Sequence, residues 1–162
     1  MVKDNMKIFI SHKSDDKDVA LKINGILTGL NIESYLDLLD EDNSLKADKL
    51  TKHIKKQLNE CTDILVVISE KTKNSWWVPF EIGMASQKDL PIVNFLKSGI
   101  DLPDYLAYWP RLKSDGDIIK YIEANRTVKK QILNESLSMK HMYTDSTISN
   151  TERFYNELKS RL

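Results

Sequence analysis

The sequence feature that most constrains the fold is an uninterrupted apolar run, Ile64-Leu65-Val66-Val67-Ile68, between Asp63 and Ser69. A strand with one face in water alternates apolar and polar residues, and this run does not alternate. Continuous apolar strands are typical of parallel sheets, because helices cover both faces of such sheets. The run therefore predicts a central parallel strand over residues 63–69.

Strand and helix patterns alternate along the rest of the chain. The other predicted strands are Lys7–Ser11, Ile32–Asp37, Pro91–Leu96 and Tyr108–Lys113. The last of these is predicted at an edge of the sheet, because it contains Pro110. The predicted helices are Val19–Leu30, Ala47–Cys61, Trp77–Gln87, Asp117–Leu133 and Phe154–Leu162, with a loop over residues 137–149. This order predicts an α/β fold: a flavodoxin-like, doubly wound sheet of about five parallel strands in the order 2-1-3-4-5, with helices on both faces.

Length and composition predict one small globular domain. Residues 1–124 are expected to form the domain, and residues 125–162 a helical extension that packs on it. Lysine plus arginine and aspartate plus glutamate both number 24, so no net charge draws the chain to nucleic acid or an anionic membrane. The single Cys61 excludes an internal disulfide and fits the cytoplasm, and no apolar run approaches membrane-spanning length.

A carboxylate and an indole follow the central strand. Glu81 lies four residues after Trp77, so the two share one face of the predicted helix. In open α/β sheets, ligands bind outside the carboxyl ends of the strands, where this helix begins. The pair suits a ligand with a planar ring and a sugar, and the alternative is that the tryptophan packs in the core and Glu81 is solvated.

The ends of the first two strands supply further candidates. Ser11 is placed to contact a ribose or phosphate oxygen, with a turn or cap as its alternative. His12 and Lys13 are candidates to face a diphosphate, or are simply solvated. Asp37 is a candidate at the rim of the second strand, or caps its end. The absence of glycine from residues 11–16 excludes a P-loop and a dinucleotide fingerprint there.

Several other residues are expected to have structural roles. Trp76 lacks the spacing to Glu81 and is predicted to pack, and Cys61 is predicted to be a small core residue. The lysines at 46, 49, 52, 55 and 56 are expected to form a solvated helix face. The three histidines show no metal-ligand spacing, so no metal is predicted.

Four segments together resemble Toll/interleukin-1 receptor (TIR) domains, especially the stand-alone bacterial type found in Thoeris antiphage defence. They cover about residues 6–124 in the family's order. The segments are Phe9-Ile10-Ser11-His12-Lys13-Ser14-Asp15-Asp16, Tyr35-Leu36-Asp37 with its acidic loop, Asp63 to Ala85, and Leu102-Pro103-Asp104-Tyr105-Leu106.

The resemblance implies an enzyme that cleaves the nicotinamide–ribose bond of NAD⁺. The products would be nicotinamide and an ADP-ribose-type signal, linear, cyclic or conjugated, acting in antiviral defence. The family's essential glutamate corresponds to Glu81 and its preceding tryptophan to Trp77. The expected substrate-binding residues are Phe9, Ser11, His12, Lys13, Asp37 and Trp77. NAD⁺ is then the substrate and no cofactor is expected.

A single carboxylate is chemically sufficient for this reaction. Nicotinamide leaves a cationic ring as a neutral molecule, so no general acid has to protonate it, in contrast to the paired carboxylates of glycosidases. The carboxylate orients the ribose hydroxyls and stabilises the positive charge that develops on the sugar. Water, an adenine nitrogen or another nucleophile then captures the ribosyl cation.

One departure and two alternatives accompany the resemblance. The family's loop after the second strand usually carries a glycine and mediates contacts between TIR domains, but residues 38–46 contain no glycine.

The chain is expected to self-associate on activation and to reach a separate effector protein through its product. The main alternative is a non-catalytic adaptor that binds other TIR domains, and a nucleoside deoxyribosyltransferase-like enzyme is a more distant one.

Overall fold

The computed structural model describes residues 5–36, 47–97, 99–102, 104–138 and 148–162, without the side chains of Ala47, Asn74 and Trp77. The described chain divides into two compact units, Met1–Lys113 and Ser114–Leu162. The predicted boundary after residue 124 falls inside a continuous helix, Asp115–Ser138. The predicted packing of the extension on the domain stays a prediction.

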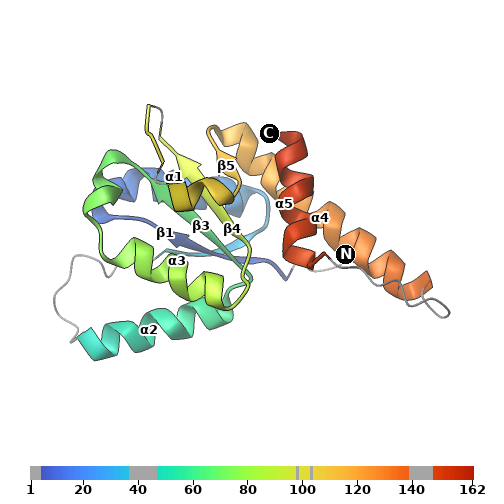
Figure 1. Cartoon of the computed structure of the whole chain (residues 1–162), viewed down its shortest axis with the longest axis horizontal. Helices are drawn as coiled ribbons and strands as arrows, with labels where there is room; N and C mark the ends of the chain where they lie inside the picture. The colour runs from blue at the N-terminus through green and yellow to red at the C-terminus, as the bar shows by residue number, and fades with distance from the viewer. Residues whose placement is uncertain (1–4, 37–46, 98, 103, 139–147) are drawn as a thin grey trace. The chain divides into compact units, whose positions relative to one another are not determined.

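The first unit is an open parallel sheet, as predicted (Figure 1). Its strands are β1 (Lys7–Ser11), β2 (Glu33–Leu36), β3 (Asp63–Ile68), β4 (Ile92–Leu96) and β5 (Arg111–Leu112). They pair in the order β2-β1-β3-β4-β5, all in parallel. The fold class, the strand order and the edge position of the fifth strand are therefore confirmed.

Within the described residues, three α-helices and three short 3-10 helices connect the strands. The α-helices are α1 (Lys17–Gly29), α2 (Ala47–Glu60) and α3 (Trp77–Gln87); the 3-10 helices are η1 (Ser14–Asp16), η2 (Glu70–Asn74) and η3 (Asp104–Tyr108). Asn31 ends α1 and Asp89 ends α3, each with a positive φ. The next amides, of Ile32 and Leu90, bond back to Leu27 and Ala85 at 2.9 and 3.0 Å. This C-terminal motif turns each helix directly into the following strand.

All six residues of β3 are buried, which explains its continuous apolar run. Alternate residues of the strands face opposite sides of the sheet. On one side, Phe9, Ile64 and Ile92 lie in register and join a core cluster with residues of α2 and α3. The intervening residues point to the other side, and the buried Ala20, Ile23 and Leu27 lie on α1.

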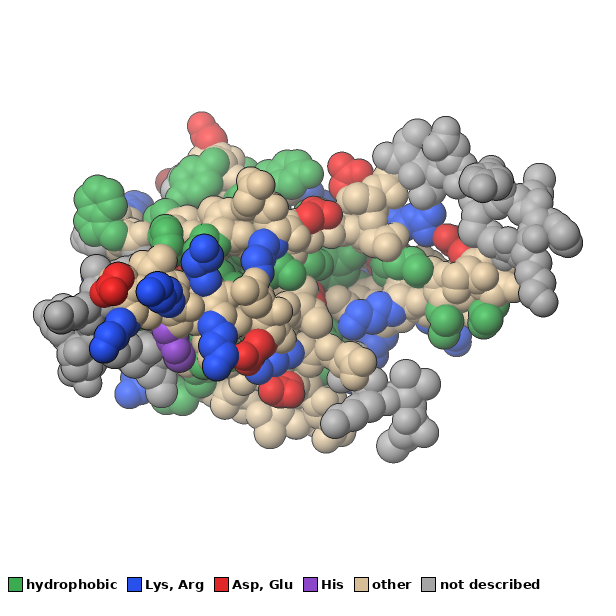
Figure 2. Space-filling model, turned by 90° about the horizontal axis from the view of Figure 1, so that it is seen from below, with side chains coloured by type: hydrophobic (Ala, Val, Ile, Leu, Met, Phe, Trp, Pro, Cys, Tyr) green, Lys and Arg blue, Asp and Glu red, His purple; other side chains and the backbone are tan. Residues whose placement is uncertain are grey.

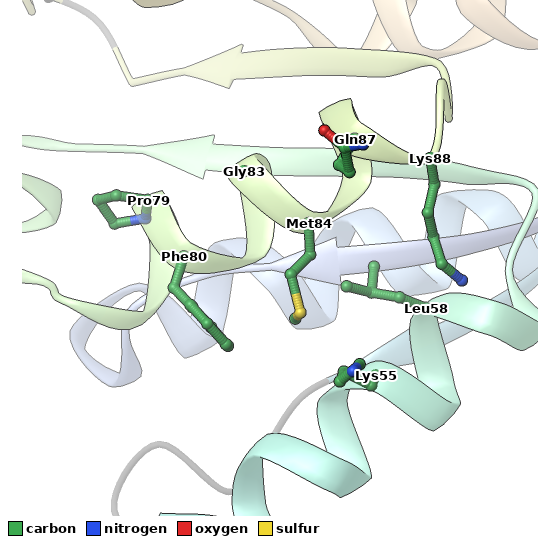
Figure 3. A pocket seen from close by; sticks show the side chains of 8 residues that line it. All are labelled: Lys55, Leu58, Pro79, Phe80, Gly83, Met84, Gln87 and Lys88. Atoms are coloured by element: carbon green, nitrogen blue, oxygen red, sulfur yellow. The ribbon is translucent and has the colours of Figure 1, made fainter.

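Helices α2 and α3 lie side by side on the same face of the sheet (Figure 1). The outer surface of α2 carries exposed lysines, and the view from below shows lysine side chains gathered over this region (Figure 2). A groove of about 410 Å³ runs between the two helices, lined by Leu58 of α2 and by Phe80 and Met84 of α3 among others (Figure 3).

The second unit is a helical pair. Helices α4 (Asp115–Ser138) and α5 (Asn150–Arg161) pack together, with the rings of Tyr121 and Phe154 5.6 Å apart. Ser149 and Glu152 form a capping box that starts α5. Helix α4 is longer than predicted at both ends, because its solvated turns carry too few apolar residues to be recognised by periodicity. No described helix is long and apolar enough to cross a bilayer.

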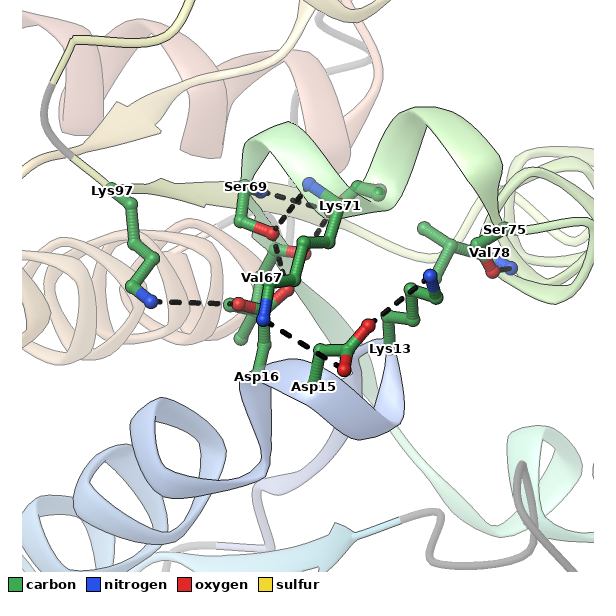
Figure 4. A network of polar contacts seen from close by, with 10 residues as sticks. Lys13, Asp15, Asp16, Val67, Ser69, Lys71, Ser75, Val78 and Lys97 are labelled. Carbon is green, nitrogen blue, oxygen red and sulfur yellow. Dashed lines mark hydrogen bonds and ion pairs between the residues drawn. The ribbon is translucent and has the colours of Figure 1, made fainter.

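A buried carboxylate ties together the loops that follow β1, β3 and β4 (Figure 4). Asp16 is 1% exposed and accepts a hydrogen bond of 2.5 Å from the Ser69 hydroxyl at the end of β3. Its other oxygen lies 3.6 Å from Nζ of Lys97, which follows β4. The Thr72 hydroxyl in turn accepts from the Ser69 amide at 2.9 Å. The carboxyl edge of the sheet is therefore fixed by one connected polar network.

A second network on the surface continues from Asp15. Its carboxylate pairs with Lys13 at 3.2 Å and with Lys71 at 3.7 Å. The hydrogen bond from Lys13, together with the charge of Lys71, holds the pKa of the Asp15 carboxyl below its ordinary value. These pairs are solvent-exposed, so they add little to stability on their own.

We expect Ser69→Ala to reduce the free energy of unfolding by about 2–3 kcal/mol, because the buried Asp16 carboxylate loses a hydrogen-bond donor. Urea denaturation followed by circular dichroism measures the change. Ser86→Ala, which removes an exposed hydroxyl of α3, is the matched control. Equal stability of the two variants would show that the Ser69–Asp16 bond does not stabilise the fold.

Cys61 should react slowly with alkylating reagents in the folded protein. Burial raises the pKa of its thiol to about 11, from an ordinary value of 9.0. At pH 8 the reactive thiolate is therefore about 100-fold scarcer than in the unfolded chain. Mass spectrometry after iodoacetamide treatment, with and without urea, measures the ratio; similar rates in both would contradict the burial of Cys61.

The same thiol gives stability a defined pH dependence. The unfolded chain releases this proton near pH 9.0, while the folded chain retains it to about pH 11. The stability linked to this proton is thus complete below about pH 9.0 and is lost as the pH rises toward 11. Cys61→Ala, whatever its effect at neutral pH, should flatten the fall in Tm over this interval.

Candidate active site

Glu81 and Ser11 meet at the carboxyl edge of the sheet, although 70 positions separate them in the sequence. Ser11 is the last residue of β1 and lies in register with Val66 of β3. Its side chain points to the same face as Phe9, where α3 packs. The Ser11 hydroxyl donates a hydrogen bond to Oε2 of Glu81, in the second turn of α3.

The local sequence explains where α3 places this glutamate. The Ser75 hydroxyl accepts a hydrogen bond of 3.3 Å from the Val78 amide in the first turn. Pro79 is tolerated because an amide in the first turn has no intrahelical partner. Val78, Ile82 and Ala85 face the core, and Glu81 lies between them at the helix end nearest the strand edge.

Glu81 is 2% exposed and Ser11 is fully buried. A buried carboxylate requires compensating hydrogen bonds, and the Ser11 hydroxyl supplies one. A carboxylate offers about four acceptor positions, so a hydrogen bond from Ser11 does not by itself prevent it from accepting a ligand hydroxyl. The arrangement can therefore orient a sugar and stabilise a nearby positive charge, provided that a ligand reaches the carboxylate.

The other residues after β1 are partly committed to the fold. His12 is buried, with Nδ1 3.3 Å from the carbonyl oxygen of Ile10, so the structure does not show the exposed basic pair considered from the sequence. Lys13 lies in the ion pair with Asp15. Phe9 is fully buried with its ring 5.3 Å from that of Tyr35, which places it behind the site and in the core. The roles of these three residues toward a ligand stay predictions.

Two predicted site residues are not placed by the structure. Asp37 lies outside the described residues, as does the acidic loop that follows it. Trp77 begins α3, but its side chain is outside the described part of the chain. The predicted pairing of Trp77 with Glu81 is therefore untested.

Sequence reasoning missed two contacts close to the site. One is the Ser69–Asp16 hydrogen bond, whose only local signal is the Ser-x-x-Thr spacing of residues 69 and 72, typical of a helix N-terminus. The other joins the Tyr35 hydroxyl to Nε2 of His53 at 2.7 Å. Neither bond is encoded by a short motif, because each connects different elements of the fold.

The prediction for Trp76 was wrong: its side chain is 89% exposed and does not pack. The groove between α2 and α3 does not include Glu81 among its lining residues. A second hollow of about 190 Å³ lies near Ser69, Thr72 and Tyr105, and Glu81 does not line it either. Among the described residues no cluster of histidine, cysteine, aspartate or glutamate is arranged to hold a metal ion.

Comparisons with known proteins agree with this architecture. The probable 3′ cyclic ADP-D-ribose synthase ThsB′ of Bacillus cereus (strain MSX-D12) is 28% identical over 113 residues, which cover 64% of this chain and 58% of that protein. The chain thus matches somewhat more than half the length of this curated relative.

Two solved structures were matched, and the first of them is similar in fold. The TIR domain of the Toll-related receptor TRR-2 from Hydra magnipapillata superimposes with a TM-score of 0.57 at 14% identity, over 80% of this chain and 95% of that chain. The TIR domains of the activated Roq1 resistosome give a TM-score of 0.48 at 13% identity, over 97% of this chain and 99% of that chain.

The model of the TIR domain family matches residues 8–124, which include all five strands except the first residue of β1, together with Ser11 and Glu81. This match covers most of the chain. The chain belongs to the TIR domain family.

Proposed function

We propose that this chain is an enzyme that cleaves the nicotinamide–ribose bond of NAD⁺ and releases nicotinamide and an ADP-ribose-type product, linear or cyclic. The observation that carries the proposal is the buried Glu81 at the carboxyl edge of β1 and β3, held there by the Ser11 hydroxyl. Membership of the TIR family and the similarity to a probable cyclic ADP-ribose synthase support it.

In the proposed reaction the bond between the ribose C1′ and the nicotinamide nitrogen breaks heterolytically. The electron pair neutralises the pyridinium ring, so nicotinamide leaves without gaining a proton. Glu81 accepts a hydrogen bond from a ribose hydroxyl and stabilises the oxocarbenium-like charge on the sugar. Attack by water gives ADP-ribose and a proton; attack by an atom of the same nucleotide gives a cyclic product.

The proposal includes a cellular setting. NAD⁺ is a substrate here and no cofactor or metal is required. The enzyme acts in the bacterial cytoplasm in antiviral defence, self-associates through contacts between TIR domains when activated, and signals to a separate effector through its product. Neither nucleic acid nor a membrane takes part.

Glu81→Gln should lower the rate of nicotinamide release from NAD⁺ by about 10²–10³-fold, because the amide keeps the shape of the side chain but loses the charge. Chromatography of the reaction over a series of protein concentrations measures the rate, since assembly is expected to be required. Glu70→Gln, at an exposed glutamate of η2, is the matched control. Equal rates for wild type and Glu81→Gln would remove Glu81 from the mechanism.

Ser11→Ala should have an intermediate effect, with a rate about tenfold below wild type, because Glu81 keeps its charge but loses the bond that orients it. Ser86→Ala again serves as the control. A rate as low as that of Glu81→Gln, with an unchanged Tm, would instead assign Ser11 a direct role at the substrate.

The alternative is a non-catalytic adaptor that acts by binding other proteins. The exposed Trp76 and the lysines of α2 favour it, because they offer a surface away from Glu81. An adaptor would release no nicotinamide at any protein concentration, and Glu81→Gln would leave its complexes unchanged.

A further inference from the structure

The groove between α2 and α3 has an apolar floor and charged ends. Leu58 of α2 faces Phe80 and Met84 of α3 across it, and the ammonium groups of Lys55 and Lys88 lie at its margins (Figure 3). Its volume of about 410 Å³ lies within the usual range of ligand sites. The described residues leave this apolar surface uncovered.

Three residues spaced four apart line the groove from the side of α3: Phe80, Met84 and Lys88. Trp76 precedes Phe80 by the same interval, at the N-cap of α3 and outside the groove lining. Trp76 is 89% exposed and Phe80 38% exposed. Exposed aromatic side chains beside an apolar recess are typical of the residues that dominate the energy of protein interfaces.

Gly83 lines the groove, and the fold around it does not explain why this position is a glycine. A Cβ at this position would meet no atom within 4 Å, and Gly83 is not among the glycines with positive φ. A glycine in the interior of a helix destabilises that helix. The absent side chain does, however, allow another backbone to approach α3 closely.

The charge of this surface is strongly positive. Exposed lysines gather on α2 and at the end of α3 (Figure 2): Lys49, Lys52, Lys55, Lys56 and Lys88. None of the five forms an ion pair with a carboxylate among the described residues. Asp48 and Glu60 lie at the two ends of α2, and the exposed Asp89 follows Lys88. These three carboxylates offset only part of the charge of the five lysines.

We propose that the groove between α2 and α3 binds an acidic, amphipathic helix of a partner protein. Two adjacent helices leave a straight groove that accepts a third helix, whose apolar residues fill the floor. The lysines attract acidic residues on either side of the apolar stripe of that helix. A symmetric dimer of this chain through the same face would place five lysines against five, so a second copy in that arrangement is disfavoured.

A planar anionic membrane fits the observations less well than a helix does. It would satisfy the lysines and Trp76, but it would leave the recess at Gly83 unfilled. The inference goes beyond the proposed NAD⁺ chemistry, because neither Ser11 nor Glu81 lines the groove.

The test uses the whole chain and two synthetic helical peptides of about 20 residues labelled with a fluorophore. Both carry leucine at positions i, i+4, i+7 and i+11. The acidic peptide has glutamate on the flanks of this stripe, and the control peptide has lysine there. Fluorescence anisotropy should show saturable binding of the acidic peptide, weakened by salt, and none of the basic peptide.

Gly83→Leu is the decisive variant, because a Cβ at this position meets no atom within 4 Å, so a side chain can be added on the groove lining. It should weaken binding of the acidic peptide at least tenfold. Gly83→Ala should raise Tm by about 2–4 °C and reduce binding less, since it adds only a methyl group. These changes leave Ser11 and Glu81 intact, so their outcome is independent of whether the chain cleaves NAD⁺.

A charge-reversal pair tests the lysines. Lys55→Glu with Lys88→Glu should weaken binding at least tenfold, and the control pair Lys17→Glu with Lys130→Glu, at exposed positions on α1 and α4, should not. The proposal is overturned by absent saturable binding, by equal affinity for the basic peptide, or by full affinity in Gly83→Leu. Vesicles rich in phosphatidylserine test the membrane alternative. If wild type and Gly83→Leu sediment equally with these vesicles and neither binds the peptide, the face is assigned to membranes instead.

Discussion

Two buried carboxylates cross-link the loops at the carboxyl edge of the sheet, and the candidate site depends on both. The end of β1 supplies the Ser11 hydroxyl to Glu81, which lies on the helix after β3. The end of β3 supplies the Ser69 hydroxyl to Asp16, which lies on the turn after β1. Each strand thus holds the segment that follows its neighbour. Because burying a carboxylate is costly without such bonds, displacement of either segment is opposed by the free energy of exposing an unpaired charge or hydroxyl.

Helix α3 contacts three different environments, and its sequence therefore shows no simple division into a polar and an apolar face. Val78 and Ile82 face the core, Glu81 faces the end of β1, and Phe80 lines the open groove. A helix that is apolar nearly all round is usually buried on all sides. Here Phe80 remains 38% exposed among the described residues, and this exposure is one of the observations behind the proposed docking of a partner helix.

The sequence was sufficient to predict the sheet, because a buried parallel strand such as β3 has a pattern of its own and each crossover helix has another. It also placed Glu81 correctly at the strand edge. It could not predict that Trp76 is exposed, because an indole is usually buried. The adjacent Trp77 is the same residue type, so the local sequence does not show which of the two is exposed. It could not pair Asp16 with Ser69 either, because 53 positions separate them and only the three-dimensional register brings them together. The short β5 was predicted from a longer segment, since periodicity does not define the end of a two-residue strand.

The edge of the sheet contains two buried carboxylates, Asp16 and Glu81, and the proposed reaction needs only one. A developing positive charge on a ribose is stabilised by a nearby negative charge. The Asp16 carboxylate is compensated by Lys97 at 3.6 Å and accepts the Ser69 hydroxyl on its other oxygen. The Asp16 carboxylate thus helps to hold the loops in place. In the proposed reaction Asp16 supports the edge and Glu81 acts on the sugar, and one carboxylate suffices because nicotinamide departs as a neutral molecule.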